Sequence, residues 1–137
     1  MPYGDGMLRK IAVVSLLALL AACKTTQPIA STAEHPVPTG AQALPLSAIE
    51  SAIVEAGARR GWRFKHVADG KVRAHYEKYP WVAEADVLFS QQSYRIVHVS
   101  SKNMANRDDG VERAYNRWTG NLDKDIEIKL QEIATRR

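Results

Sequence analysis

The sequence predicts an α+β fold, in which a four-stranded antiparallel meander carries two helices on one face (αββββα) and so forms two layers. Three patterns predict this fold. Four short segments alternate apolar and polar residues, which is typical of half-buried strands. A helical apolar repeat precedes these segments, and a longer one follows them. The 137 residues are enough for one such domain.

The first helix is expected over residues 45–60. Ser47 followed by Glu50 is the pattern of a capping box, and Gly57 and Gly61 offer positions at which the helix can stop. The apolar stripe consists of Leu46, Ile49, Ile53 and Ala56.

The strands are expected near residues 62–67, 71–77, 82–89 and 94–99. The first loop decides their register, because cross-strand partners share a face of the sheet. A two-residue turn at Asp69-Gly70 would pair Phe64 with His75 and set charge beside aromatic rings. A three-residue loop, Ala68-Asp69-Gly70, pairs Phe64 with Ala74 and puts its glycine where left-handed backbone is needed. The three-residue loop is therefore predicted.

A turn at Gln91-Gln92 extends the same parity to the last hairpin, where Val87 pairs with Ile96 and Phe89 with Tyr94. One face of the sheet then consists of Trp62, Phe64, Val72, Ala74, Tyr76, Ala83, Ala85, Val87, Phe89, Tyr94 and Ile96.

The cover for this face is a last helix over residues 111–135. Gly120 lies in its middle, where glycine costs about 1 kcal/mol against alanine. A close approach to the sheet over Ala74 and Ala85 would explain it. The apolar stripe of this helix consists of Val111, Tyr115, Trp118, Leu122, Ile126, Leu130 and Ile133.

The N-terminal segment, residues 1–22, is expected to be a signal peptide. Basic Arg9 and Lys10 precede a short apolar run, which is too short to cross a membrane as a helix. Met7 stands two residues before the basic pair, so the start is either Met1 or Met7.

The motif Leu20-Ala21-Ala22-Cys23 resembles the lipobox of bacterial lipoproteins. The resemblance implies a diacylglyceryl thioether on Cys23, cleavage between Ala22 and Cys23, and acylation of the new amino terminus. Lys24 follows in place of the aspartate that retains such lipoproteins at the inner membrane. We therefore expect a lipid-anchored protein of the cell envelope, on the outer membrane and facing the periplasm. Two or three acyl chains make a stable anchor.

Residues 23–44 are expected to form the lipidated cysteine and a flexible tether, and residues 45–137 the folded domain. Pro28, Pro36 and Pro38 oppose both helices and central strands. His35 is interpreted as a solvent-exposed residue of this tether.

Composition excludes several classes of site. Cys23 is the only cysteine, which rules out an intrachain disulfide and zinc sites built from several thiolates. The net charge of +4 is too small to indicate a nucleic-acid-binding protein. Alternation places His66 and His98 on the helix side of the sheet and His75 on the other side. Since histidines at a metal site must converge, no metal and no cofactor are predicted.

Catalytic residues are not predicted either. Ser100 or Ser101 with His98 and Asp108 supplies the residue types of a serine hydrolase, but no nucleophile-elbow pattern surrounds them.

The face of the sheet turned away from the helices is the candidate binding site. It is either an ordinary solvated face or a docking surface. As a docking surface, its apolar residues would bind a protein or a second copy of the chain, and its basic residues would bind an anionic envelope polymer or a lipid headgroup. The fourth strand ends the sheet, so a partner strand could add there. The candidate docking residues are Arg63, Lys65, Arg73, His75, Val82, Leu88, Arg95, Val97 and Val99.

A second resemblance covers residues 49–130. The order Gly61-Trp62, Gly70-x-Val72, Tyr94-x-Ile96, Ser101-x-Asn103, Tyr115-Asn116-x-Trp118 and Leu122 is similar to that of a group of short proteobacterial lipoproteins with no assigned activity. The chain departs from this pattern at His98, where an aromatic residue is expected, and at Met104, where leucine is expected. The resemblance implies a fold and a cellular location but no biochemical activity.

These observations predict a membrane-anchored envelope lipoprotein that acts as a non-enzymatic binding or scaffolding module. Its partners would be the membrane, through the N-terminal lipid, and an envelope protein or anionic envelope polymer. The alternatives are a small periplasmic hydrolase and an inhibitor or accessory subunit of an envelope enzyme.

Overall fold

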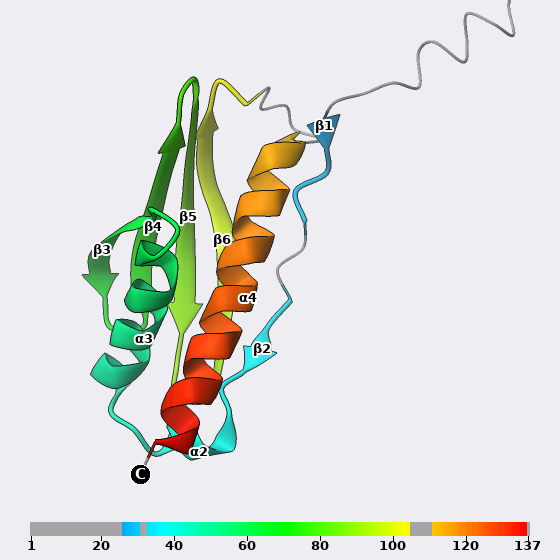
Figure 1. The fold of residues 1–137 in the computed structure, drawn as a ribbon. Helices are drawn as coiled ribbons and strands as arrows, with labels where there is room; N and C mark the ends of the chain where they lie inside the picture. The colour runs from blue at the N-terminus through cyan, green and yellow to red at the C-terminus, as the bar shows by residue number, and fades with distance from the viewer. Residues whose placement is uncertain (1–25, 31–32, 105–110, 137) are drawn as a thin grey trace, which may run out of the picture.

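The computed structural model describes residues 26–30, 33–104 and 111–136 (Figure 1). The predicted signal peptide and Cys23 lie outside these ranges. No helix within them is both long enough and apolar enough to cross a membrane.

Two layers make up the domain, and the predicted fold class is confirmed. Figure 1 shows both long helices lying on the same face of the sheet. The antiparallel meander consists of β3 (Arg63–Ala68), β4 (Lys71–Lys78), β5 (Trp81–Phe89) and β6 (Ser93–Lys102). The helices on it are α3 (Leu46–Ala58) and α4 (Arg113–Thr135).

The predicted register is confirmed at both hairpins. Phe64 pairs with Ala74, and Val87 pairs with Ile96. Gly70 has a φ of +80°, and a Cβ there would come within 2.7 Å of a backbone oxygen, so glycine is required. The first loop is tighter than predicted, because β3 shifts register after His66 and continues to Ala68.

The face of the sheet toward the helices carries the core. All the residues predicted for this face are buried except Phe64 and Tyr76, which are partly buried and pack against the core. Helix α4 covers the face with Tyr115, Trp118, Leu122, Ile126 and Leu130.

Helix α3 does not begin with a capping box. Its N-cap is Pro45, so Ser47 already lies inside the first turn and its side chain caps nothing. Glu50 turns to the sheet instead, and its carboxylate lies 2.6 Å from Nδ1 of His66. The predicted stop is correct, since Gly61 has a φ of +94° just beyond the helix.

Gly120 does not approach the sheet, and the explanation offered for it is wrong. It is exposed on α4, and a Cβ there would meet open space. The close approach occurs at Gly57 of α3, where a Cβ would lie 2.3 Å from Cζ of Phe64 and 3.0 Å from Cδ1 of Leu122.

The last helix starts two residues later than predicted. Val111–Glu112 form a short strand, β7, which pairs with β1 (Thr26–Gln27) in a separate two-stranded sheet. Residues near the N-terminus of the chain are therefore attached to the first turn of α4.

The predicted flexible tether is wrong for residues 35–44. Strand β2 (His35–Pro36) adds to the outer edge of β6, and α2 (Thr39–Gln42) packs against the end of α4. Val37 and Ala41 are buried in the core. The prolines permit this arrangement, since an edge strand tolerates proline and Pro38 precedes the first turn of α2.

His35 is likewise not a free tether residue. Its ring stacks on Tyr94 with the centroids 5.4 Å apart, and its Nε2 lies 3.0 Å from a carboxylate oxygen of Asp123. These contacts join β2 to both β6 and α4.

Candidate functional site

The face of β3–β6 turned away from α3 and α4, here called the open sheet face, is covered by no helix or strand of the described chain (Figure 1). The pairing of the strands places on it eight of the nine candidate docking residues, namely Arg63, Lys65, Arg73, His75, Val82, Leu88, Arg95 and Val97. The ninth, Val99, is a bulge residue between Ser100, which pairs with Glu84, and His98, which pairs with Ala85. It is exposed but stands outside the regular alternation.

A paired carboxylate occupies the middle of the open sheet face. Asp86 of β5 accepts hydrogen bonds of 2.9 and 3.2 Å from the guanidinium of Arg73, and Nζ of Lys71 lies 3.6 Å away. Asp86 is only 7% exposed, and the hydrogen bonds from Arg73 lower the pKa of its carboxyl group. The bidentate geometry fixes both side chains on the sheet.

A second network surrounds His75. Its Nδ1 lies 3.0 Å from Glu84 and its Nε2 2.7 Å from Glu77, which also accepts a 3.4 Å hydrogen bond from Arg63. The hydrogen bond with Glu77, followed by that with Glu84, raises the pKa of His75 above its ordinary value of 6.5. The basic residues of β3 and β4 are therefore partly neutralised by their neighbours, which the sequence interpretation missed.

The unpaired cations lie toward the two sides of the sheet. Lys65 on β3 and Arg95 on β6 are exposed and form no ion pair within the described part of the chain. Val82 and Leu88 of β5 and Val97 of β6 share this face and are half-buried. The open sheet face thus has a fixed, charge-paired centre with exposed cations beyond it.

The His75 network predicts a pH dependence of stability. Because the folded-state pKa is raised, this histidine stabilises the fold fully below about pH 6.5, and the contribution is lost as pH rises through the higher folded-state value. We expect His75→Gln to lower the free energy of unfolding more at about pH 5.5 than at about pH 9. Urea unfolding at the two pH values measures this difference.

His98 provides the control for this experiment. Burial lowers its pKa, so its contribution is present above about pH 6.5 and is lost as pH falls through the lower folded-state value. His98→Gln should therefore show the opposite pH trend. An equal loss at both pH values in His75→Gln would contradict the prediction.

The residues of the hydrolase alternative are partly brought together. Nε2 of His98 lies 3.0 Å from Oγ of Ser101, and the histidine ring packs edge-on against Tyr115 at 4.9 Å. Ser101 is 7% exposed and belongs to the helix side of the sheet. Asp108 lies outside the described residues. The hydrogen bond thus joins a buried serine to a histidine that packs against Tyr115 of α4.

The Tyr-Asn-x-Trp motif also has structural contacts. Nδ2 of Asn116 donates to the carbonyl of Pro28 over 3.0 Å, and its Oδ1 accepts from the amide of Ala30 over 2.9 Å. Trp118 packs against Tyr76 with ring centroids 4.8 Å apart. The motif therefore attaches the N-terminal segment to α4 and fills the core beside it.

No family model, curated protein or solved structure matches the chain. Fold and site alone define its class, which is a two-layer α+β domain with one sheet face that no helix or strand of the described residues covers.

Proposed function

We propose that this chain is a non-enzymatic envelope lipoprotein, anchored through acylated Cys23, whose open sheet face docks an acidic surface of another envelope protein. The observation that carries this proposal is the charge balance of the uncovered face. Its carboxylates are Glu77, Glu84 and Asp86, and its cations, which outnumber them, are Arg63, Lys65, Lys71, Arg73, Arg95 and Lys102. Complementary charge speeds association and excludes wrong partners.

A protein fits this face better than a polysaccharide does. Val82, Leu88 and Val97 are half-buried among the charged side chains, and apolar groups inside a polar surround are typical of protein interfaces. The Arg73–Asp86 pair is already held in place, so docking need not order it. An acidic protein surface could therefore contact both the apolar residues and the exposed cations.

The proposed localisation of the protein is supported by the lipobox-like motif that ends at Cys23 and by Lys24 after it. They support the proposal that the docking domain lies in the periplasm, on the inner side of the outer membrane. The partner would accordingly be a protein of that compartment.

Crosslinking in cells followed by mass spectrometry tests the docking face. The best variant is the double substitution Lys65→Glu and Arg95→Glu, because both side chains are exposed and unpaired among the described residues. Arg73 is unsuitable, since its reversal would set a second carboxylate beside Asp86. We expect a several-fold loss of one crosslinked acidic partner.

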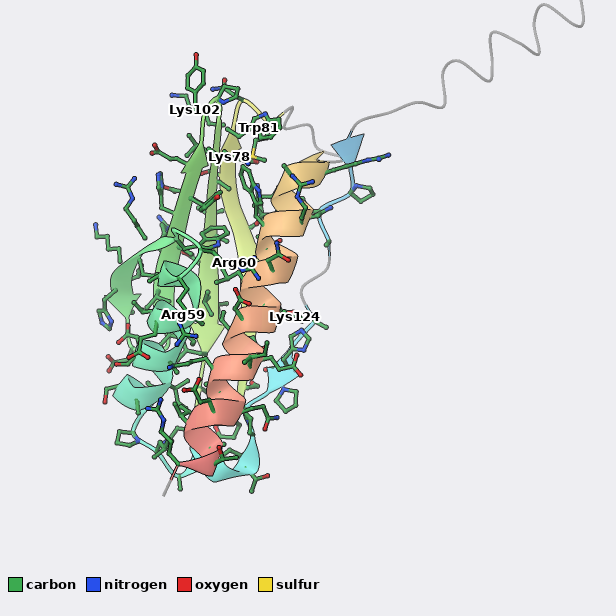
Figure 2. All side chains as sticks on the ribbon, in the orientation of Figure 1. Arg59, Arg60, Lys78, Trp81, Lys102 and Lys124 are labelled. Carbon is green, nitrogen blue, oxygen red and sulfur yellow. The ribbon has the colours of Figure 1, made fainter. Side chains whose placement is uncertain are left out.

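Lys124→Glu is the control, because it makes the same kind of charge reversal at one exposed position of α4, away from the open sheet face (Figure 2). It should keep the partner. Unchanged crosslinks in the double variant would contradict the proposal, as would recovery of a glycan in place of a protein.

A further inference from the structure

The turn between β4 and β5 exposes an aromatic side chain in basic surroundings. Tyr79 is 98% exposed, the largest exposure among the large hydrophobic residues of the described chain. Trp81, two residues on, is half-buried and packs against Trp118 with ring centroids 6.0 Å apart. An exposed tyrosine side chain at the end of a hairpin contributes nothing to the core, so packing does not explain why a tyrosine stands at this position.

Cations gather beside this turn. Lys78 is exposed and pairs across the hairpin with Trp81, and exposed Lys102 at the end of β6 pairs with Val82. Figure 2 shows Lys78, Trp81 and Lys102 together at this end of the molecule. Glu77, the acidic side chain of β4, is hydrogen-bonded to Arg63 and His75, and its negative charge also attracts Lys102. We call Lys78, Tyr79, Pro80, Trp81 and Lys102 the hairpin tip.

The hollow beside the hairpin tip is also basic. It has a volume of about 290 Å³ and lies between α4 and the end of β4, with Lys78, Arg117 and Trp118 in its wall. Neither cation forms an ion pair within the described residues. Among the described residues, Lys78 and Arg117 are therefore available to an anionic group at the tip.

The N-terminal segment enters the domain at this same end. Strand β1 pairs with β7 at the start of α4, with Thr26 opposite Glu112. Figure 1 shows β1 and the β4–β5 turn at one end of the domain, with α2 and the β5–β6 turn at the other. Two residues, Lys24 and Thr25, lie between Cys23 and Thr26, and the three steps of extended chain that join them span at most about 11 Å.

We propose that the hairpin tip is a second membrane contact, which docks on anionic phospholipid headgroups with Tyr79 at the interface. The proposal rests on the proposed acylation of Cys23. Lipid attached so close to β1 holds this end of the domain at the bilayer, where tyrosine and tryptophan are favoured and where anionic headgroups attract lysine. The tether makes the docking intramolecular, so a weak contact suffices.

A single fluorescent label measures the contact in the full acylated protein. Acylation consumes the thiol of Cys23, so Tyr79→Cys introduces the only reactive thiol of the chain. A polarity-sensitive dye attached there is read in vesicles of phosphatidylethanolamine with phosphatidylglycerol. We expect a blue-shifted emission that nitroxide lipids labelled near the headgroup quench.

Ser47→Cys is the matched control, since Ser47 is exposed on α3 near the opposite end of the domain. Its dye should remain water-exposed and unquenched. Adding Lys78→Glu and Lys102→Glu to Tyr79→Cys should lower the ratio of docked to undocked protein at least about tenfold. Vesicles of phosphatidylcholine alone should reduce quenching in the same direction.

The outcomes separate this proposal from the proposed function. Acylated protein in which the tip dye stays unquenched, or is quenched no more than the control, overturns the membrane contact alone. Self-quenching of the dye that rises with protein density assigns the tip to a second copy of the chain and overturns it too. A wild-type protein that takes up thiol label at Cys23 overturns the anchor and the tip contact together.

Discussion

Replacement of Cys23 by serine is expected to abolish acylation completely and to leave the precursor uncleaved. The thiol is the nucleophile for lipid transfer in the lipobox family that the motif before it resembles, and a hydroxyl does not replace it. Intact-mass analysis should show the full precursor mass with no fatty acid, and labelled palmitate should not be incorporated.

Lys24→Ser is the control for this substitution, because it changes the neighbouring residue and keeps the thiol. It should be acylated and cleaved like the natural sequence. The prediction is contradicted if Cys23→Ser fractionates and matures normally, or if the natural protein carries an unmodified amino-terminal methionine.

Replacement of Leu122 by alanine is expected to have the largest effect on stability. Leu122 is 0% exposed in the middle of α4, and its side chain fills the space beside Gly57 where α3 approaches. A buried leucine cut to alanine costs about 2–5 kcal/mol through lost burial and the cavity left behind. For a domain of marginal stability this is a large fraction of the free energy of unfolding. Urea unfolding followed by tryptophan fluorescence measures it.

Ile128→Ala controls for helix propensity and for the loss of an aliphatic group on the same helix. Ile128 is 56% exposed, so its truncation should change the free energy of unfolding by no more than about 0.5 kcal/mol. Equal losses in the two variants would contradict the packing of α4 described here.

The meander could be predicted because a strand has a period of two. Once the first loop places Phe64 opposite Ala74, every residue of β4, and of β3 as far as His66, has a defined face. The structure of residues 35–44 could not be predicted in this way. Local signals there are prolines, whereas Val37 and Ala41 are buried by β6 and by the far end of α4, which are distant in sequence.

The candidate site could likewise be predicted only in part. Alternation placed the cations of β3 and β4 on the open sheet face, but their partners depend on the register of β4 with β5. No turn residue revealed that Arg73 lies opposite Asp86. Glu50 fitted a local capping pattern and instead contacts His66 across the layers. Nor does a sequence reveal that Tyr79 is exposed, since tyrosine is more often partly buried.

Under the proposed acylation of Cys23, the attachment of β1 to β7 limits how far from the bilayer the domain can lie. A flexible tether as far as Leu44 would have an end-to-end distance of roughly 25 Å, which would separate the domain from the bilayer by up to that distance on average. Held at Thr26 instead, an acylated chain stands directly on the lipid, and α4 of 23 residues sets a height of about 35 Å. On this proposal a partner must reach within that height of the bilayer, which favours partners that are embedded in the same membrane or lie flat against it.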